Sequence, residues 1–334
     1  MPTKHMGNLL VSLRALEALV RHFGASHTAL VIDSGYRPII ECLDLRCEVV
    51  YFPRGLVARS PWWRQLFLMG SFLRTVRALA ADTTIALEGD LPSLRLIPFC
   101  RPGHTVAPEN AFSTRMKERI ALDHGQQHRF HDYAHVVKRV TGRQLEPGYP
   151  ALAVGVGAQQ GLERSLSALG IAPDKPIAVL HPGATKYYKQ WPVTHFATLA
   201  RALHRQGYQL VLTGAGERDG TAITALRQLG DTPMTSLHDR LSIAELIALC
   251  RQAALFVGND TGPTHLAAAA GTRTVALFGP TDEHRWGPMG ANVRIVRHPL
   301  PCPPDCHRGR CSLDHRCINT LAAEPVLAAI EALS

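Results

Sequence analysis

The residues with the clearest chemical potential follow an apolar run at 254–258. There the chain reads Asn259-Asp-Thr-Gly-Pro-Thr-His265, a glycine turn with a proline suited to the first turn of a helix. The unpaired N–H groups at the start of such a helix, together with its dipole, bind anions such as phosphate. A simpler interpretation is that Asp260 or Thr261 only caps the helix. A similar turn, Gly279-Pro-Thr281, follows the next apolar run.

A second loop combines hydroxyl and cationic side chains after another apolar run. His181–Pro192 contains Thr185, Lys186 and Lys189, which can donate hydrogen bonds to a diphosphate. Its Gly183 would let backbone approach a ligand closely. The simpler interpretation of either lysine is a solvated surface cation.

A third loop, residues 213–219, carries a glycine pair followed by Glu217. A carboxylate at this position can accept hydrogen bonds from ribose hydroxyls, or it can lie in a first helical turn and favour the dipole. The glycine spacing is not the full dinucleotide fingerprint, and the chain contains no GxxxxGK[ST] motif. A dehydrogenase and a P-loop ATPase are therefore disfavoured.

Alternating apolar patterns predict the elements that position these loops. In the second half we expect strands at 177–181, 208–213, 254–258 and 274–278, and helices at 192–205, 218–229, 243–251, 264–270 and 322–333. In the first half we expect strands at 28–33, 47–52 and 84–87, and helices at 7–23, 39–43, 61–80 and 127–141. Strands that alternate with helices indicate parallel sheets, whose ligands lie beyond the carboxyl ends of the strands.

Two doubly wound α/β domains account for this alternation. We place the first over residues 1–155 and the second over 172–318, with the Gly-, Pro- and Ala-rich stretch 143–161 as a linker. A carboxyl-terminal helix within 319–334 is expected to pack back on the first domain. Only Met1–Lys4 precede the first loop, which begins at His5, so the first strand is expected to be short or missing, or to lie upstream.

Composition narrows the class of protein. The chain has 334 residues, a formal charge of +9, 46% hydrophobic residues and 6% aromatic residues. This is too apolar for a disordered chain and poor in aromatics for a protein that stacks nucleic-acid bases. The mild, scattered positive charge favours acidic small molecules or anionic lipid surfaces, and we predict no nucleic-acid partner.

The loops His181–Pro192 and Gly258–Thr281 together resemble glycosyltransferase family nine, the ADP-heptose:lipopolysaccharide heptosyltransferases. The similarity extends from Gly7 to the carboxyl end. It implies a GT-B fold, in which two Rossmann-like doubly wound domains face a central cleft. It also implies inverting transfer of heptose from ADP-heptose to a lipopolysaccharide core or related lipid-linked glycan, with no cofactor required. Alternatives are another nucleotide-sugar donor, a protein acceptor, or a non-catalytic relative that binds ADP-sugar or lipopolysaccharide.

The resemblance also implies roles for individual residues of the second domain. The side chains of Thr185 and Lys189 would contact the donor phosphates, and Lys189 would stabilise the leaving group. Glu217 would bind the ribose and Leu241 would border the adenine. The remaining candidate donor-binding residues are Lys186, Asp260, Thr261, Gly262, Pro263, Thr264 and His265. Of these, the backbone of Thr261–Thr264 would hold the diphosphate, and His265 would support the loop.

The amino end departs from the family pattern. The family's first loop reads Gly-Asp, and its aspartate is taken as the general base, whereas this chain has Gly7-Asn8. Because an amide does not accept a proton at neutral pH, either another group such as His5 is the base or catalysis depends on positioning and leaving-group stabilisation. A chain that transfers poorly or not at all is the third alternative. Asn8 is also expected to cap the first helix.

Four cysteines crowd into one short segment with the spacing Cys302-x3-Cys306-x4-Cys311-x5-Cys317. Four thiolates in a loop can hold zinc or iron tetrahedrally, and His307 and His315 are spare ligands. Such a metal would be structural. The alternative is a reduced loop without metal.

The segment Arg59–Arg74 mixes tryptophans, aliphatic residues and arginines. It is a candidate contact for an anionic membrane, or a core-packed helix with arginines at its rim. Since the amino end has no apolar signal segment, we expect a cytoplasmic protein, peripheral on the inner face of the inner membrane.

Overall fold

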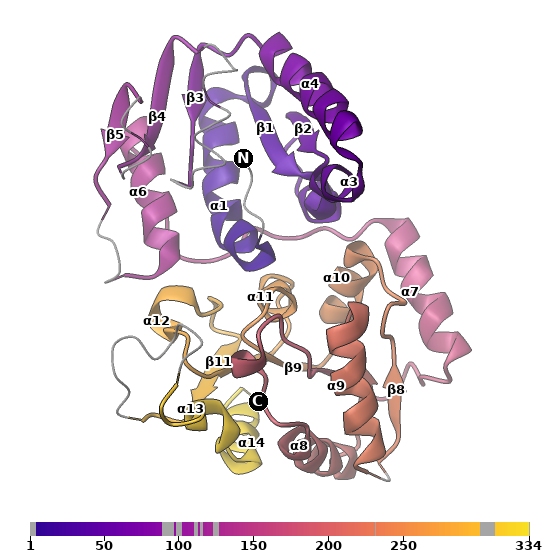
Figure 1. The fold of residues 1–334 in the computed structure, drawn as a ribbon. Helices are drawn as coiled ribbons and strands as arrows, with labels where there is room; N and C mark the ends of the chain where they lie inside the picture. The colour runs from indigo at the N-terminus through magenta and orange to yellow at the C-terminus, as the bar shows by residue number, and fades with distance from the viewer. Residues whose placement is uncertain are drawn as a thin grey trace. The chain divides into compact units, whose positions relative to one another are not determined.

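A computed structural model describes residues 5–88, 97, 102–109, 113, 116–122, 127–230, 232–300 and 311–333. The chain divides into two compact units, residues 1–150 and 151–334 (Figure 1). Both units are mixed α/β structures whose strands pair only in parallel among the described residues. The predicted α/β fold class is confirmed.

The second unit contains one six-stranded parallel sheet in the order β11-β10-β9-β6-β7-β8. Its strands are β6 (Ile177–His181), β7 (Gln209–Leu212), β8 (Met234–Ser236), β9 (Leu255–Asn259), β10 (Thr274–Phe278) and β11 (Val293–Arg297). The chain begins at the centre, builds outward through β7 and β8, and returns to the other side through β9. This is the doubly wound order, and the strand order reverses between β6 and β9, where such folds bind ligands.

Helices cover both faces of this sheet because alternate residues of each strand point to opposite sides. Ala178 and Leu180 lie in one apolar cluster with α8, α9 and α14, whereas Ile177 and Val179 lie in another with α7, α10 and α11. The helices of this unit are α7 (Val156–Ala168), α8 (Val193–Arg205), α9 (Gly216–Gln228), α10 (Ile243–Gln252), α11 (Gly262–Ala269), α12 (Glu283–Trp286), α13 (Arg316–Asn319) and α14 (Ala323–Glu331).

Two segments of this unit differ from the sequence-based expectation. The predicted linker 143–161 runs into α7, which forms because Leu162 and Leu166, one turn apart, are buried against α10. The carboxyl-terminal helix, expected on the first domain, has its buried residues Ala323, Val326 and Ile330 in the core of the second unit. There α14 packs against α8, β10 and β11.

The described strands of the first unit form two separate parallel sheets, β1-β2 and β3-β4-β5, rather than one. These strands are β1 (Ala29–Asp33), β2 (Glu48–Phe52), β3 (Thr83–Ile85), β4 (His104–Pro108) and β5 (Glu118–Ile120). No strand among the described residues joins β1 to β3. The expectation of a short or missing first strand falls on residues 1–4, which lie outside the described residues.

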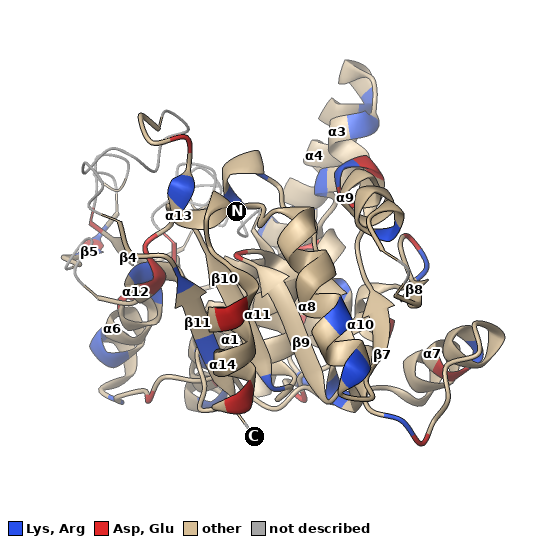
Figure 2. Cartoon of the chain, turned by 90° about the horizontal axis from the view of Figure 1, so that it is seen from below, with Lys and Arg blue, Asp and Glu red and all other residues tan. Residues whose placement is uncertain are grey.

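The first unit's helices are α1 (Met6–Phe23), α2 (Arg37–Glu41), α3 (Arg54–Arg59), α4 (Trp62–Ala78) and α6 (Arg129–Thr141). Helix α1 is nearly all apolar on one face and packs against α6. The arginines of α3 are drawn in blue in Figure 2. Across the described residues, none of the helices combines the length and hydrophobicity that a bilayer crossing demands.

Candidate functional site

The helix α11 begins at the switch point, directly after β9. Its N-cap Thr261 makes no side-chain capping bond, and its first turn holds Pro263 but no acidic residue. The hydroxyls of Thr261 and Thr264 instead donate to the carbonyl oxygen of Asn259, at 3.3 and 2.5 Å. Thr261 thus occupies the N-cap position, but its side chain does not cap the helix. Amide groups at a helix start without a side-chain cap suit an anion.

Lys189 and Asp260 form an ion pair across the switch point. Lys189 ends the short turn Tyr187–Lys189 after β6, and its Nζ lies 2.6 Å from Oδ2 of Asp260 after β9. The Asp260 side chain is 7% exposed and that of Lys189 is 25% exposed. Asp260 therefore does not cap α11: it holds the Lys189 ammonium beside the start of that helix.

Asn259 connects the two loops and was not singled out from the sequence. Its fully buried side chain donates to the carbonyl oxygens of Pro182 and Gly183, both at 3.0 Å, and accepts from the N–H of Trp191 at 2.9 Å. One carboxamide thus fixes both ends of the loop 182–191. The signal available in the sequence was a polar residue at the end of an otherwise apolar strand.

The loops after β7 and β8 are also joined. The N–H of Gly216, next to Glu217, donates to Oδ1 of Asp239 at 2.8 Å, and His238 Nε2 lies 2.9 Å from the Gly216 carbonyl oxygen. Glu217 is exposed, and Leu241, three residues after His238, is half-buried. The structure therefore places the loop proposed to meet ribose beside the loop proposed to meet adenine.

Arg218 links the β7 loop to the β6 loop, because its Nη1 donates to the carbonyl oxygen of Thr185. Thr185 and Lys186 are exposed, whereas His265 in α11 is buried. The predicted donor-binding residues of the second unit thus lie on four loops at one edge of one sheet, and direct hydrogen bonds or ion pairs link these loops.

A buried histidine lies beneath this edge. Nδ1 of His181 is 3.3 Å from the Thr213 hydroxyl, and Nε2 is 3.8 Å from Asp219. Burial lowers the pKa of His181, although the Asp219 carboxylate acts in the opposite direction. A Cβ on Gly183 would clash with the Asp219 carboxylate. The absence of a side chain at Gly183 thus leaves the space that the Asp219 side chain occupies.

The first turn of α1 holds the two candidate residues of the amino-terminal unit. His5 is the N-cap, without a side-chain capping bond, and Asn8 is the third residue of the helix. The expectation that Asn8 is the cap is therefore wrong, because the helix begins two residues earlier, at Met6. His5 has extended backbone (φ −113°, ψ 121°) and lies just before the helix, whereas Asn8 lies in its first turn.

The cysteine segment is only partly described, since Cys302 and Cys306 lie outside the described residues. Cys317 is buried and Cys311 is half-buried, and the Cys311 Sγ accepts from the His315 N–H at 3.3 Å. The His315 ring stacks on Tyr188 of the β6 loop, and its buried Nε2 has no hydrogen-bond partner among the described residues. No group of three metal-ligating side chains occurs within the described part of the chain.

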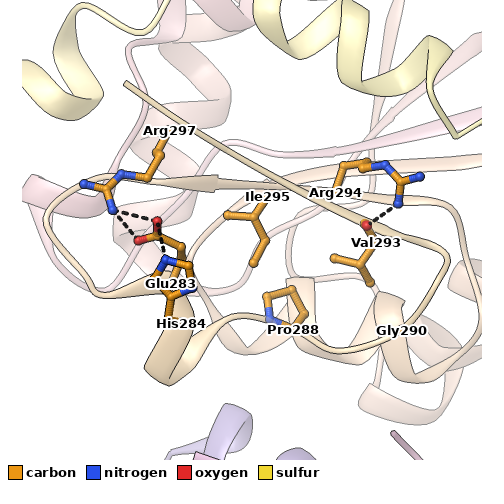
Figure 3. A pocket seen from close by; sticks show the side chains of 8 residues that line it. All are labelled: Glu283, His284, Pro288, Gly290, Val293, Arg294, Ile295 and Arg297. Carbon is orange, nitrogen blue, oxygen red and sulfur yellow. Dashed lines mark hydrogen bonds and ion pairs between the residues drawn. The ribbon is translucent and has the colours of Figure 1, made fainter. Parts of the chain in front are cut away.

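A cavity of about 410 Å³ lies away from these residues, beside α12 and β11 (Figure 3). Its lining includes Ile295 and the ion pair between Arg297 and Glu283, with N–O distances of 2.6 and 2.5 Å. This pair holds the pKa of Glu283 below its usual range against the effect of burial. None of the predicted donor-binding residues lines this cavity.

A family model described as glycosyltransferase family 9 (heptosyltransferase) matches residues 69–315. Lipopolysaccharide heptosyltransferase 3 of Escherichia coli is 35% identical over 134 residues, which are 40% of this chain and 39% of that protein. A second such protein, from strain K12, is 32% identical over 52% of this chain and 50% of its own length. The matched region thus spans half or less of these relatives.

Solved structures match over nearly the whole chain. The glycosyl transferase family 9 structure from Veillonella parvula superposes with a TM-score of 0.86 at 19% identity, over 98% of this chain and 94% of that one. The E. coli heptosyltransferase WaaC with ADP gives a TM-score of 0.73 at 20% identity, over 99% and 98%. At these identities the likeness shows the fold, which is the GT-B arrangement of α/β units.

Proposed function

Because the chain belongs to glycosyltransferase family 9, we propose that it transfers heptose from ADP-heptose, with inversion, to a lipopolysaccharide-core or related glycan acceptor. The observation that carries this proposal is that four linked loops share one edge of this sheet, with the start of α11 and the Lys189 ammonium at the β6–β9 switch point. The similar heptosyltransferase solved with ADP supports an adenine nucleotide as the donor's leaving group.

The donor diphosphate is proposed to lie against the first turn of α11. The amide groups there and the helix dipole offset its negative charge, and Lys189, released in part from Asp260, adds a charge-assisted hydrogen bond. Glu217 accepts from the ribose hydroxyls and Leu241 borders the adenine. As the acceptor oxygen bonds to the anomeric carbon, the bond to the phosphate oxygen breaks and ADP leaves, with its new charge stabilised by Lys189.

The acceptor hydroxyl must also lose a proton. The imidazole of His5 is able to take it, whereas the Asn8 amide only orients the hydroxyl through a hydrogen bond. His5 precedes α1 as its N-cap residue, and Asn8 lies in the first turn of that helix. We therefore propose His5 as the general base and Asn8 as a positioning residue.

A donor screen tests the proposed function. Purified protein is incubated with ADP-heptose, other ADP-sugars and UDP-sugars, with and without a lipid-linked glycan, and released nucleotide is measured. We expect turnover with ADP-heptose, strongly reduced in Lys189→Ala and unchanged in Lys175→Ala, an exposed lysine outside the site. Saturable ADP-sugar binding without turnover would instead support a non-catalytic binding protein, the alternative that Asn8 favours. If only another nucleotide sugar is turned over, the sugar of that donor replaces heptose in the proposed reaction.

A structural zinc or iron ion in the cysteine segment is a separate proposal. Cys311 and Cys317 lie close in sequence to His315, whose buried Nε2 finds no hydrogen-bond partner in the part of the chain that the structure describes. These residues fit a metal-binding segment that would also include Cys302 and Cys306, and the bound ion would stabilise the segment that packs on the β6 loop. Elemental analysis of protein purified without chelators should find one ion per chain. Metal that is substoichiometric, or retained after Cys311→Ser, would refute the proposal.

A further inference from the structure

Helix α4 carries an apolar surface that is exposed in the described part of the chain. Trp62, Trp63, Leu66 and Phe67 are 72%, 61%, 65% and 67% exposed, and Leu56 on α3 is 47% exposed. The described chain has nine exposed large hydrophobic residues, and five of them lie within these twelve positions. So high a local density is not the ordinary scatter of surface apolar residues.

The buried residues of α4 lie in the second half of the helix. Phe72 and Val76 are its buried residues, and they join Val50 and Phe52 of β2 in one cluster. The first half extends beyond this contact with its aromatic residues outward. The alternative that the segment is a core-packed helix is therefore wrong for residues 62–67, although it holds for Phe72 and Val76.

The charge around this surface has one sign. Between Arg54 and Ala81 the chain contains five arginines and no aspartate or glutamate. Arg54 pairs with Asp33. The other four are exposed, and none of them forms an ion pair within the described residues: Arg59, Arg64, Arg74 and Arg77.

The apolar and basic residues share a face of α4. Trp63 and Phe67 are one turn apart, and Arg74 follows Phe67 by seven residues, two further turns along the same side. Tryptophan and phenylalanine favour the boundary between lipid headgroups and acyl chains, while arginines favour anionic headgroups. The tip of the helix is thus apolar and aromatic, and its base is cationic.

We propose that the surface formed by Leu56, Trp62, Trp63, Leu66 and Phe67, with the four arginines, binds an anionic lipid bilayer. A second copy of the chain is a poorer occupant, because a symmetric contact would bring arginines against arginines. This proposal rests on the proposed function in one respect: a lipid-linked acceptor gives the protein a reason to contact a membrane. Vesicle binding and nucleotide binding are measured independently, so either proposal can fail alone.

The test is cosedimentation of the full chain with large unilamellar vesicles of phosphatidylethanolamine and phosphatidylglycerol, against vesicles of phosphatidylcholine. We expect binding to the anionic vesicles only, weakened by 0.5 M NaCl. Trp62→Ser/Trp63→Ser/Phe67→Ser should reduce partitioning at least tenfold without changing the melting temperature or ADP affinity. Arg74→Gln/Arg77→Gln should reduce it about 25-fold, since each arginine near an anionic surface contributes about fivefold.

Matched controls use exposed residues elsewhere. Val156→Ser/Leu229→Ser removes exposed apolar side chains, and Arg164→Gln/Arg227→Gln removes exposed charges, so both should bind vesicles as the unchanged protein does. Three results would overturn the proposal: an equal loss of vesicle binding in the controls, no binding of the unchanged protein to anionic vesicles, or binding that persists in the triple variant. So would light scattering that shows a dimer dissociated by the triple substitution, because the surface would then be a contact between copies.

Discussion

Replacing Lys189 by alanine should have two separable effects, one on donor binding and one on folding stability. The ammonium that faces the proposed diphosphate is lost, which removes a charge-assisted hydrogen bond of about 1.5–3 kcal/mol. The Kd for ADP should therefore rise about 10- to 150-fold. Lys175→Ala should leave this Kd unchanged.

The second effect arises because the substitution leaves the Asp260 carboxylate without its cation. Asp260 is 7% exposed, and breaking a fully buried ion pair costs about 3–5 kcal/mol. Lys189 is 25% exposed, so solvent screens part of the interaction and we expect about 2 kcal/mol. For a unit of this size, that lowers the melting temperature by about 4–8 °C.

The double substitution Lys189→Ala/Asp260→Asn separates the two roles. Without the carboxylate no buried charge is left unpaired, so the melting temperature should return toward that of the unchanged protein while the Kd for ADP stays high. Calorimetric titration with ADP and differential scanning calorimetry measure the two quantities on the same samples. ADP affinity restored in the double variant would refute the donor role of Lys189. An unchanged melting temperature in Lys189→Ala would show that the ion pair adds nothing to stability.

Three further predictions concern other residues. Asn259→Ala should weaken ADP binding at least tenfold in calorimetry, because the carbonyl oxygens of Pro182 and Gly183 and the N–H of Trp191 lose their hydrogen-bond partner. Asn259→Asp should not restore binding, since a carboxylate cannot donate a hydrogen bond to the two carbonyl oxygens. If His5 is the base, His5→Ala should reduce the transfer rate by about 10²–10⁴-fold, and Asn8→Asp should raise it little. A sharp rise in the rate in Asn8→Asp, with no change in His5→Ala, would instead show that the unchanged protein lacks a general base. The folded-state pKa of His181 lies below its ordinary value near 6.5, so the unfolded chain binds the proton first and stability falls as the pH drops from 7.5 to 5.5. Urea denaturation at both pH values should show a smaller pH-dependent loss of stability in His181→Gln than in the unchanged protein, and equal losses would contradict the assignment.

The sequence by itself determined the features that depend on local patterns. Strands β6 and β10 were expected at their observed bounds, and the helix at 264–270 was expected one turn after an apolar strand. The loops that follow β6, β7 and β9 were identified as candidate ligand-binding loops because glycine, proline and hydroxyl residues come directly after the carboxyl end of a predicted strand. Such signals lie within a few neighbouring residues, so the amino-acid sequence alone is enough to identify them.

The tertiary structure decided which of these residues meet. Lys189 and Asp260 are 71 positions apart, and Asn259 holds Pro182 from 77 positions away. These pairs exist because β6 and β9 are adjacent at the switch point, and strand order is fixed by how helices cover both sheet faces rather than by any local motif.

Burial also required the tertiary structure. The apolar residues of α4 look alike in the sequence, yet Phe72 is buried against β2 whereas Phe67 is exposed. Hydrophobicity gives the free energy that burial would release, but only the path of the chain determines whether a packing partner lies within reach.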